Sequence, residues 1–399
     1  MDSDMALDIE TNARDDRKSA ALAAQRVRAR DGARVVAEFG LAREVLRSSP
    51  NMVQAGLGHD DTANGDPQFA SVFFLDGEPH RRRRTAIARF FTPKAISTRH
   101  RIVMEETTDR LLAELQAAGH GQLDVITFEL AVAVAAEIVG LNDSAIGPLS
   151  RRISAAMFGT RLPGMNRFVR PFGTAWAAAH VGRFFLRDVR PAIASRRAQP
   201  REDVISHLIE EGYPDKAILM ECLTYAGAGM VTTREFIVMA AWHLFDNDPL
   251  RQRFVAGDEQ TQFAILEELL RLEPVASMLY RQADADTTLS SCTVADGELV
   301  ALNLRESNLD PAAVGECPYA IDPDRAAKAG IVGAFLSFGD GSHRCPGAQV
   351  ALTETRVFLD RLMRVPGIRL ENQPRMTWNP SLESYELRRA RIRCDRRQS

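Results

Sequence analysis

The chain has 399 residues, of which 45% are hydrophobic and 26% are charged, as in ordinary globular proteins with a large apolar core. Its 50 basic and 53 acidic residues nearly balance, which argues against nucleic acid as a partner, because proteins that bind nucleic acid usually carry excess positive charge. No apolar run reaches the roughly 18 to 20 residues that cross a bilayer, and the first thirty residues lack the apolar stretch of a secretory signal. We therefore expect a cytoplasmic protein without a membrane span.

The hydrophobic pattern predicts a mainly helical protein. Apolar residues at helical spacing indicate helices over 95–118, 123–139, 172–198, 215–245 and 261–272. Pro191 should kink or divide the third helix, because proline lacks the backbone N–H that a helix interior uses. The fourth helix would be about 46 Å long, enough to cross a whole domain.

Short β-rich segments follow at 287–294 and 298–304. Asp296-Gly297 between them is typical of a hairpin turn. The region from Pro374 onward is also predicted to form strands and turns. Since no internal repeat or low-complexity linker is evident, the pattern predicts a mainly α fold with small β-sheets.

The five cysteines are isolated along the chain, at positions 222, 292, 317, 345 and 394. Without a C-x-x-C pair, a zinc ribbon is not expected. An odd, scattered set in a long chain also does not indicate a disulfide framework. Cys345 differs from the others because glycines surround it.

The segment 338–347 reads Phe-Gly-Asp-Gly-Ser-His-Arg-Cys-Pro-Gly. Its glycines allow turns that bring a loop close to a flat ligand. The thiolate of Cys345 is a soft ligand suited to iron. A helix predicted over 348–363 would stabilise that thiolate through its N-terminal dipole. A glycine-rich turn before a helix is the alternative, but chance would produce the full pattern in on the order of one chain in 10⁶ at average residue usage.

This segment resembles the haem-binding signature of the cytochrome P450 family, as found in soluble bacterial haem-thiolate monooxygenases. The resemblance implies a triangular single domain that holds haem b between the long helix and the cysteine loop. It implies that Cys345 is the ligand of the haem iron and that Phe338 packs near the sulfur and porphyrin. His343 would face a haem propionate, and Gly347 would let the backbone approach the cofactor.

Asp76, His80 and Arg84 lie at intervals of four residues, so they would share one face of a helix. This segment resembles the propionate-binding helix of the same family, which implies that His80 and Arg84 contact the haem. Arg281 matches another propionate-binding arginine of the family. Without the other motifs, a solvated charged surface would be the favoured interpretation of the arginine run 81–84.

Glu268 and Arg271 are three residues apart, a spacing that suits an ion pair on one helical face. On its own such a pair is more often exposed and weak. Its distance from the cysteine loop matches the E-x-x-R helix of the family, and Arg325 resembles the second arginine of that ion pair. We assign all three residues to structure rather than to chemistry.

The long helix contains the sequence Ala-Gly-Met-Val-Thr-Thr over 228–233, which resembles the oxygen-binding motif of the family. The resemblance implies that Gly229 and Thr232 are catalytic, with Thr232 hydrogen-bonded to the bound oxygen species. Glycine inside a helix costs about 1 kcal/mol relative to alanine. Close approach to the haem, with a local opening for dioxygen, would explain Gly227 and Gly229, but so would close packing of two helices.

Val231 departs from the family pattern, which usually has an acid at this position. A valine side chain neither accepts nor donates a proton. We favour a proton relay rerouted through water, for which Glu235, one helical turn further along, is a candidate. A polar group on the substrate, or protons from bulk water, are the alternatives.

The resemblance implies a haem-thiolate monooxygenase that inserts one oxygen atom from dioxygen into a hydrophobic small molecule. No flavin- or nicotinamide-binding region is visible, so we expect electrons from a separate ferredoxin and ferredoxin reductase. The alternatives are a haem-thiolate protein that binds a ligand or gas without turnover, and a peroxide-driven variant. We expect the monooxygenase domain over 30–399, preceded by an N-terminal extension over 1–29 that could be flexible.

By analogy with the family, the substrate pocket should be lined mainly by apolar residues, a composition that favours a hydrophobic substrate. These are residues 72–74, 157–176, Tyr225, Ala228, Met230, 275–279, Ser381 and Leu382.

Overall fold

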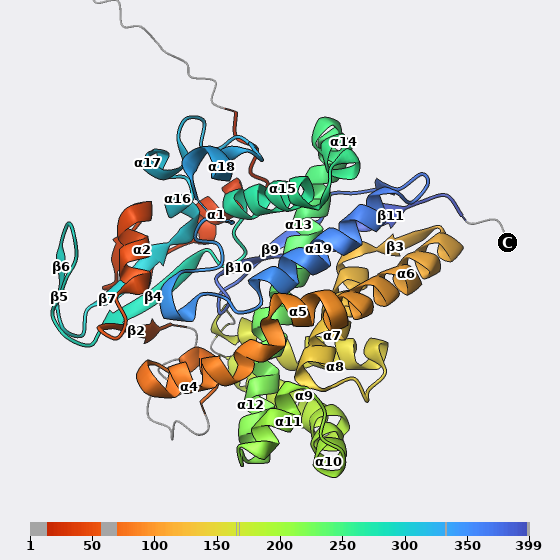
Figure 1. Cartoon of the computed structure of the whole chain (residues 1–399), viewed down its shortest axis with the longest axis horizontal. Coiled ribbons are helices and arrows are strands. Elements are labelled where there is room, and N and C mark those ends of the chain that lie inside the picture. The colour runs from red at the N-terminus through yellow and green to blue at the C-terminus, as the bar shows by residue number, and fades with distance from the viewer. Residues whose placement is uncertain (1–13, 57–69, 165, 167, 332, 397–399) are drawn as a thin grey trace, which may run out of the picture.

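The computed structural model describes residues 14–56, 70–164, 166, 168–331 and 333–396, which form one domain that is 59% helical with small sheets (Figure 1). The mainly α fold class predicted from the sequence is therefore confirmed. The α-helices are α1 (Ala20–Arg26), α2 (Phe39–Arg47), α4 (Gly77–Ala88), α5 (Pro93–Ala95), α6 (Arg101–Ala118), α7 (Leu123–Val139), α8 (Ile146–Ala156), α9 (Arg170–Phe184), α10 (Arg190–Ala198), α11 (Val204–Glu210), α12 (Asp215–Tyr225), α13 (Thr232–Asp246), α14 (Asp248–Ala256), α15 (Glu259–Leu272), α16 (Leu304–Ser307), α17 (Pro311–Val314), α18 (Arg325–Ala329) and α19 (Ala348–Met363).

The strands of the described residues form small, separate sheets. They are β1 (Arg34–Val36), β2 (Met52–Ala55), β3 (His120–Gln122), β4 (Met278–Ala283), β5 (Thr287–Thr288), β6 (Thr293–Val294), β7 (Leu299–Asn303), β8 (Arg369–Leu370), β9 (Arg375–Asn379), β10 (Ser384–Arg388) and β11 (Arg391–Arg393). The four-stranded sheet has the order β1-β7-β4-β2, with β1 parallel to β7 and the other neighbours antiparallel. The strands expected after Pro374 are present as β9, β10 and β11.

The long helix expected over 215–245 is present as α12, a π-helical segment Ala226–Val231, and α13. It begins after Pro214 and ends where the side chain of Asn247 caps α14. Every residue from Thr233 to Leu244 is buried. Figure 1 shows this helix running through the middle of the domain, behind α19. It is therefore the central element around which the other helices pack.

The other predicted helices are also present. α7 and α19 have the predicted bounds, and the helix predicted over 95–118 begins slightly earlier, at Pro93. The helix predicted over 172–198 consists of α9, a π-helical segment Phe185–Val189, and α10. Pro191 lies in the first turn of α10. Proline has no backbone N–H to donate to the preceding helical turn. The predicted interruption at Pro191 is therefore present as the π-helical segment just before it.

The predicted hairpin around Asp296-Gly297 is wrong. Gly297 does adopt the left-handed backbone of a tight turn, with φ of +75°. The strand after it, β7, nevertheless pairs with β4 and β1, while β5 and β6 pair with each other. Val300, Ala301 and Leu302 of β7 are fully buried. The burial of these side chains determines which strands pair with β7, and a local turn sequence does not predict that pairing.

The N-terminal segment is held against the domain from residue 14 onward. The buried carboxylate of Glu273 accepts hydrogen bonds from the hydroxyl and the backbone N–H of Ser19, the latter at 3.0 Å. The carboxylate of Asp16 accepts the backbone N–H of Ile321 at 2.9 Å. Within the described ranges, no helix combines the length and the apolar character that a bilayer crossing requires.

Candidate active site

The segment around Cys345 is a tight loop that leads into α19. The backbone N–H of Cys345 donates to the carbonyl of Phe338 at 2.9 Å, which closes the loop. Gly339 and Gly341 have φ of +68° and +66°, a backbone conformation that side chains disfavour. A Cβ on Gly341 would lie 2.1 Å from the carbonyl oxygen of Leu46 in α2. Glycine is therefore required at 341 both for the turn and for the contact with α2.

The Cys345 thiol is surrounded by groups that can stabilise a negative charge on its sulfur. Burial raises the pKa of this thiol, and the backbone N–H groups of Gly347 and Ala348 and the charges of Arg84 and Arg344 oppose that rise in part. Gly347 is the N-cap of α19, so the positive end of the helix dipole points toward the sulfur. The sulfur is not paired in a disulfide. A free thiol in this setting can bind a metal ion once it loses its proton.

Next to this loop lies a group of basic side chains, which we call the cation cluster after its two arginines: His80 and Arg84 of α4, Arg281 of β4, and His343. The rings of His80 and His343 are stacked at 4.0 Å between centroids. Burial, with the charges of His343, Arg84 and Arg281, lowers the pKa of His80 to about 4.

The positive charges of the cation cluster are only partly balanced by nearby carboxylates. Asp76 is the carboxylate that opposes these charges at His80, and its Oδ1 lies 2.9 Å from Nε2 of His343. Arg281 is buried, and burial lowers its pKa to about 10. Such a cluster would be stabilised by added carboxylates, and an Arg guanidinium is well suited to hold them. The donor set therefore fits the two propionates of a haem whose iron lies at Cys345.

Arg84 connects the cation cluster to the cysteine loop. Its Nη2 donates to the carbonyl of Arg344 at 2.6 Å. The side chain of Phe338 is half-buried and packs against the main hydrophobic core. All the cofactor-binding residues expected from the sequence thus lie on α4, β4 and the loop before α19.

The π-helical segment of the long helix contains the expected oxygen-binding motif. The Thr232 hydroxyl donates to the carbonyl of Ala228 at 2.7 Å. Ala228 is exposed, and Gly229 is only half-buried, although the helix crosses the centre of the domain. A Cβ on Gly229 would meet no atom within 4 Å. Close helix packing therefore does not explain this glycine, whereas an open space beside the helix does.

Val231 and Glu235 point away from that open space. Val231 is buried and lines a small enclosed cavity together with Phe128, Ser154, Met157, Thr160, Arg234, Asn379, Glu386 and Arg388. Oε1 of Glu235 accepts hydrogen bonds from Arg234 and Arg388, and Oε2 accepts the backbone N–H of Leu387 at 2.6 Å. Both oxygens of the fully buried Glu235 carboxylate are therefore occupied, in an ion-pair network whose Arg388 side chain is partly exposed. This geometry gives Glu235 a structural role and argues against it as the proton relay.

The E-x-x-R pair is buried rather than exposed. Arg271 donates from Nε and Nη2 to the carboxylate of Glu268, both at 2.8 Å, and Nε of Arg325 donates to the same carboxylate at 3.1 Å. The guanidinium groups also donate to backbone carbonyls of the segment that precedes the cysteine loop. The assignment of these residues to structure agrees with this arrangement.

Sequence reasoning missed one buried contact near the cation cluster. Arg83, a member of the arginine run, donates from Nη1 to Glu221 of α12 at 3.0 Å, and Glu221 accepts the backbone N–H of Val72 at 2.9 Å. Both side chains are buried. Arg83 lies on a different side of α4 from the exposed Arg81 and Arg82. Its position around the helix was the only feature of the sequence that could have indicated its burial.

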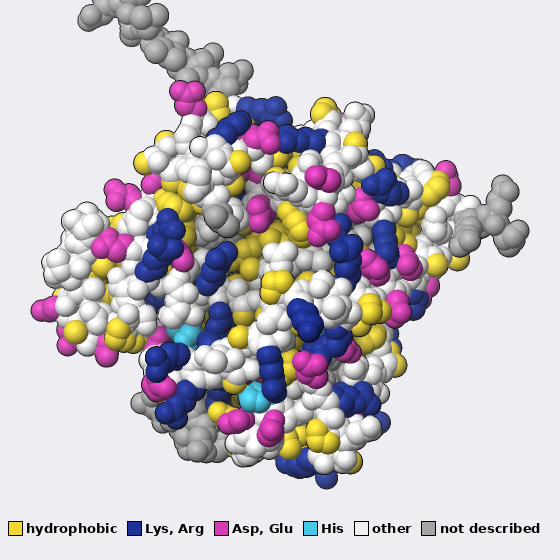
Figure 2. All heavy atoms as spheres, in the orientation of Figure 1, with side chains coloured by type: hydrophobic (Ala, Val, Ile, Leu, Met, Phe, Trp, Pro, Cys, Tyr) yellow, Lys and Arg dark blue, Asp and Glu magenta, His cyan; other side chains and the backbone are white. Residues whose placement is uncertain are grey.

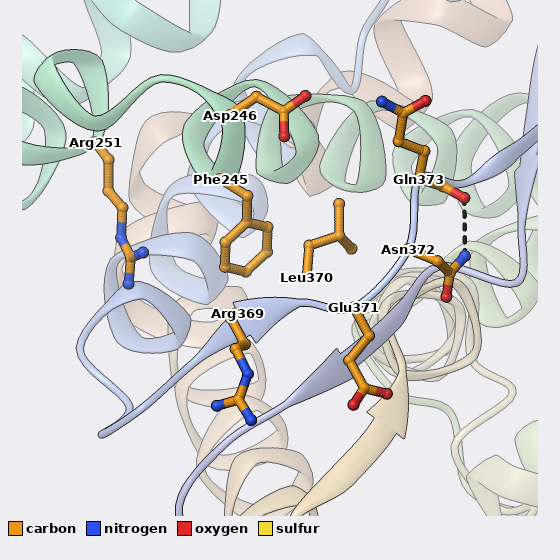
Figure 3. A pocket seen from close by; sticks show the side chains of 8 residues that line it. All are labelled: Phe245, Asp246, Arg251, Arg369, Leu370, Glu371, Asn372 and Gln373. Atoms are coloured by element: carbon orange, nitrogen blue, oxygen red, sulfur yellow. Dashed lines mark hydrogen bonds between the residues drawn. The ribbon is translucent and has the colours of Figure 1, made fainter.

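A separate surface cavity of about 290 Å³ lies at the far end of α13, between Phe245, Arg251 and the segment 369–373 (Figure 3). None of the site residues expected from the sequence lines it. Thr232 and Phe245 are thirteen residues apart along one helix, which corresponds to about 20 Å. This cavity is therefore remote from the expected oxygen-binding motif.

A thiol at a helix N-terminus, a cation cluster beside it and an opened central helix together fit the requirements of a haem-thiolate site. A family model described as Cytochrome P450 matches residues 263–376. The putative cytochrome P450 138 of Mycobacterium tuberculosis is 28% identical over 358 residues, covering 83% of this chain and 78% of that protein. The biotin biosynthesis cytochrome P450 of Bacillus subtilis is 28% identical over 337 residues, covering 82% and 81%.

Solved structures agree with these relatives. P450BioI in complex with an acyl carrier protein ligated to hexadec-9Z-enoic acid superposes with a TM-score of 0.74 at 23% identity, covering 90% of this chain and 91% of that one. Ligand-free CYP164A2 of Mycobacterium smegmatis has a TM-score of 0.70 at 26% identity, covering 90% of each chain. The family model, these relatives and these structures all support the cytochrome P450 family for this chain. It is a haem-thiolate monooxygenase that binds haem b and uses dioxygen and a small-molecule substrate.

Proposed function

We propose that Cys345 is the iron ligand and that this enzyme oxidises a hydrophobic small molecule with electrons from a separate ferredoxin and ferredoxin reductase. The observation that carries the assignment is the position of the Cys345 thiol, between the N-terminus of α19 and the cation cluster. Haem b, when bound, supplies the activation of dioxygen, and a thiolate ligand favours O–O cleavage.

The residues around the cofactor have separate tasks. The backbone N–H groups of Gly347 and Ala348 stabilise the negative charge of the Cys345 sulfur. His80, Arg84, Arg281 and His343 would bind the propionates and fix the orientation of the ring. Phe338 would cover one side of the sulfur and keep water away from it.

The opened segment of the long helix serves the reaction itself. Gly229 leaves space beside the backbone for dioxygen. The Thr232 hydroxyl, which now donates to Ala228, would hold a proton at Oγ1 beside that space. Val72, Met157 and Leu382, three members of the expected pocket lining, are partly buried apolar residues next to the main core. Their character supports a hydrophobic substrate.

A spectrum of the reduced, carbon monoxide-bound protein tests the ligand assignment. Sulfur donation to iron should give the red-shifted Soret band of thiolate ligation, and Cys345→Ala should lose it. Cys317→Ala is the matched control, because Cys317 is also a free cysteine but is exposed. A band that survives in Cys345→Ala would show that another group is the ligand.

A haem-thiolate protein that binds a ligand without turnover is a second candidate, and Val231 is the observation that favours it. The apolar side chain of Val231 occupies the position where the family usually has an acid. The carboxylate of Glu235 cannot replace that acid, because it accepts hydrogen bonds from Leu387 and Arg388. The amount of product formed per reduced cofactor consumed distinguishes the two functions. Binding spectra without substrate-dependent cofactor consumption would favour the second candidate.

A further inference from the structure

The surface cavity at the far end of α13 combines apolar and charged side chains. We call it the α13 cavity, and it is lined by Phe245, Asp246, Arg251 and residues 369–373. Its volume of about 290 Å³ is close to the lower limit of small-molecule sites in proteins. Figure 3 shows Phe245 and Leu370 at its centre, with the charged side chains around them. Both central side chains are half-buried and pack against the main hydrophobic core.

The two carboxylates of the α13 cavity each have a cation that does not line it. Oδ2 of Asp246 lies 2.5 Å from Nζ of Lys18, and Oε1 of Glu371 lies 3.5 Å from Nε of Arg393. Lys18 and Arg393 are not part of the cavity wall. Because these two cations offset the two carboxylates, the cavity gains little net negative charge from Asp246 and Glu371.

The two arginines of the cavity have no such counter-charge. Nη2 of Arg251 donates to the carbonyl of Met363 at 3.3 Å, and Nη1 of Arg369 donates to the carbonyl of Gly367 at 3.1 Å. Within the part of the chain that the structure describes, neither guanidinium forms an ion pair with a carboxylate. Each guanidinium has five N–H donors, so both arginines keep donors for a ligand. The α13 cavity is therefore positively charged.

The sheet register adds to the positive charge at Arg369. Arg369 of β8 lies directly opposite Arg393 of β11. Like charges in directly opposite positions destabilise a sheet. Glu371 offsets the charge of Arg393 and leaves Arg369 without a partner of opposite charge. A bound anion beside Arg369 would relieve the remaining repulsion.

The chemistry of the α13 cavity indicates the class of its ligand. Guanidinium groups bind carboxylates through paired N–H donors. The ring of Phe245 offers a flat apolar surface, and Cζ of Arg251 lies 5.6 Å from the centre of this ring. An inorganic anion would leave Phe245 and Leu370 uncovered, and a neutral apolar molecule would leave both arginines unpaired. A carboxylate attached to a single ring matches both parts of the cavity.

We propose that the α13 cavity is a binding site for a small organic carboxylate whose apolar body is about the size of one ring. The carboxylate accepts hydrogen bonds from Arg251 and Arg369, and the apolar body covers Phe245 and Leu370. The site is separate from the oxygen-binding motif, because Phe245 lies about 20 Å along the helix from Thr232. The proposal is independent of the substrate and the redox partner proposed above.

Fluorine NMR of para-fluorobenzoate with the haem-loaded enzyme tests the site. The ligand signal should broaden when the enzyme is added and sharpen again when unlabelled benzoate competes. Inorganic phosphate and benzyl alcohol should compete much less, because each matches only one part of the cavity. The Soret band recorded in the same titration should not shift, since the cavity is remote from the oxygen-binding motif.

Substitution of either arginine should weaken binding. Arg251→Gln and Arg369→Gln each remove a charged donor, so each should lower the affinity for para-fluorobenzoate by at least about tenfold. Arg253→Gln is the matched control, because Arg253 is on the same helix but pairs with Asp324 at 2.6 Å and does not line the cavity. An unchanged haem spectrum shows that each variant is folded.

Asp246→Asn should act in the opposite direction. The substitution removes a negative charge from the α13 cavity and frees the charge of Lys18, while the size of the side chain hardly changes. The affinity for para-fluorobenzoate should therefore rise severalfold at low ionic strength, and the gain should shrink as salt is added. Disturbed packing would not produce such a gain.

Three results would overturn the proposal. The α13 cavity is not a carboxylate site if the wild-type enzyme leaves the para-fluorobenzoate signal sharp. Undiminished binding in both Arg251→Gln and Arg369→Gln, accompanied by a Soret shift, would place the benzoate in the haem pocket instead. Phosphate that competes as well as benzoate would show that Phe245 and Leu370 do not contribute, and that the site does not select organic carboxylates.

Discussion

At the scale of single residues, the position of a cysteine in the fold decides its chemistry. Burial raises the pKa of the Cys222 thiol far above its usual value, and the charges of Glu221 and Asp203 raise it further. Burial also acts on Cys345, but two backbone N–H groups and two arginines oppose it there. The same side chain is therefore inert in α12 and a candidate metal ligand before α19.

The proton supply can be tested at Thr232. Thr232→Ala removes the hydroxyl beside Gly229, so reduced oxygen should escape as peroxide, and product per reduced cofactor should fall severalfold. Thr232→Ser keeps the hydroxyl and should retain coupling. Peroxide and product are assayed together. Coupling that is the same in Thr232→Ala and in the wild type would mean that Thr232 does not deliver protons.

A second residue-scale prediction concerns Glu354 in α19. Its side chain is buried, and burial raises its pKa to about 8. Between its ordinary pKa of about 4.5 and pH 8, the unfolded chain releases this proton while the folded chain keeps it. The contribution of Glu354 to the free energy of unfolding should therefore be complete below pH 4.5 and fall as the pH rises, by at most about 1.4 kcal/mol per pH unit.

Glu354→Gln removes this titration, so its stability relative to the wild type should increase between pH 5 and pH 8. Urea unfolding at several pH values measures the difference. Glu114→Gln on α6 is the control, because the Glu114 side chain is 61% exposed. A constant difference between Glu354→Gln and the wild type across this range would place the pKa of Glu354 outside it.

At the scale of secondary structure elements, the contact between the cysteine loop and α2 constrains the site. Gly341 and Gly330 both adopt left-handed backbones, with φ of +66° and +63°. A Cβ on Gly341 would collide with Leu46, whereas a Cβ on Gly330 would meet nothing within 4 Å. Gly341→Ala should therefore lose haem retention as well as stability. Gly330→Ala should show the cost of the backbone conformation alone, about 1 kcal/mol.

Haem content after gel filtration and thermal unfolding measure these two effects. If Gly341→Ala and Gly330→Ala retained haem equally and unfolded at the same temperature, the contact with Leu46 would not restrain the loop.

The elements themselves were largely predictable. Helices α7 and α19 have the bounds expected from apolar spacing, and the central helix differs from its expected end by one residue. The pairing of β7 was not predictable from local sequence. Its parallel partner β1 is far away in the sequence, and its antiparallel partner β4 is not the strand next to it along the chain. The burial of β7 determines both pairings. Arg83 and Glu221 are likewise 138 residues apart, and no local pattern relates them.

At the scale of the whole molecule, one face combines the cysteine loop with exposed positive charge. Figure 2 shows Lys and Arg side chains gathered over α4 and the loop beside it. The side chains of Arg81 and Arg82 are 76% and 80% exposed, and Arg344 is exposed as well. We propose that the expected ferredoxin docks here, because an acidic partner would complement this positive charge.

Charge reversal tests this docking face. Arg81→Glu and Arg344→Glu should slow reduction by ferredoxin roughly tenfold at low ionic strength, and the effect should shrink as salt is added. Arg110→Glu on α6 is the control, since Arg110 is exposed but far along a different helix. Stopped-flow reduction across a salt series provides the rates. If both variants are reduced like the wild type at every salt concentration, the ferredoxin docks elsewhere.

The sequence by itself determined the helical fold class, the central helix and the cysteine loop, because each of these depends on local spacing of apolar residues or on adjacent residue types. It also indicated His80, Arg84, Arg281 and His343 one at a time. Only the tertiary structure brought these four side chains together from α4, β4 and the loop before α19. Only the tertiary structure placed Glu235 in an ion-pair network, because its partner Arg388 is 153 residues away. Contacts between distant segments follow from how whole elements bury their surfaces, and that outcome is not encoded in any one stretch of the chain.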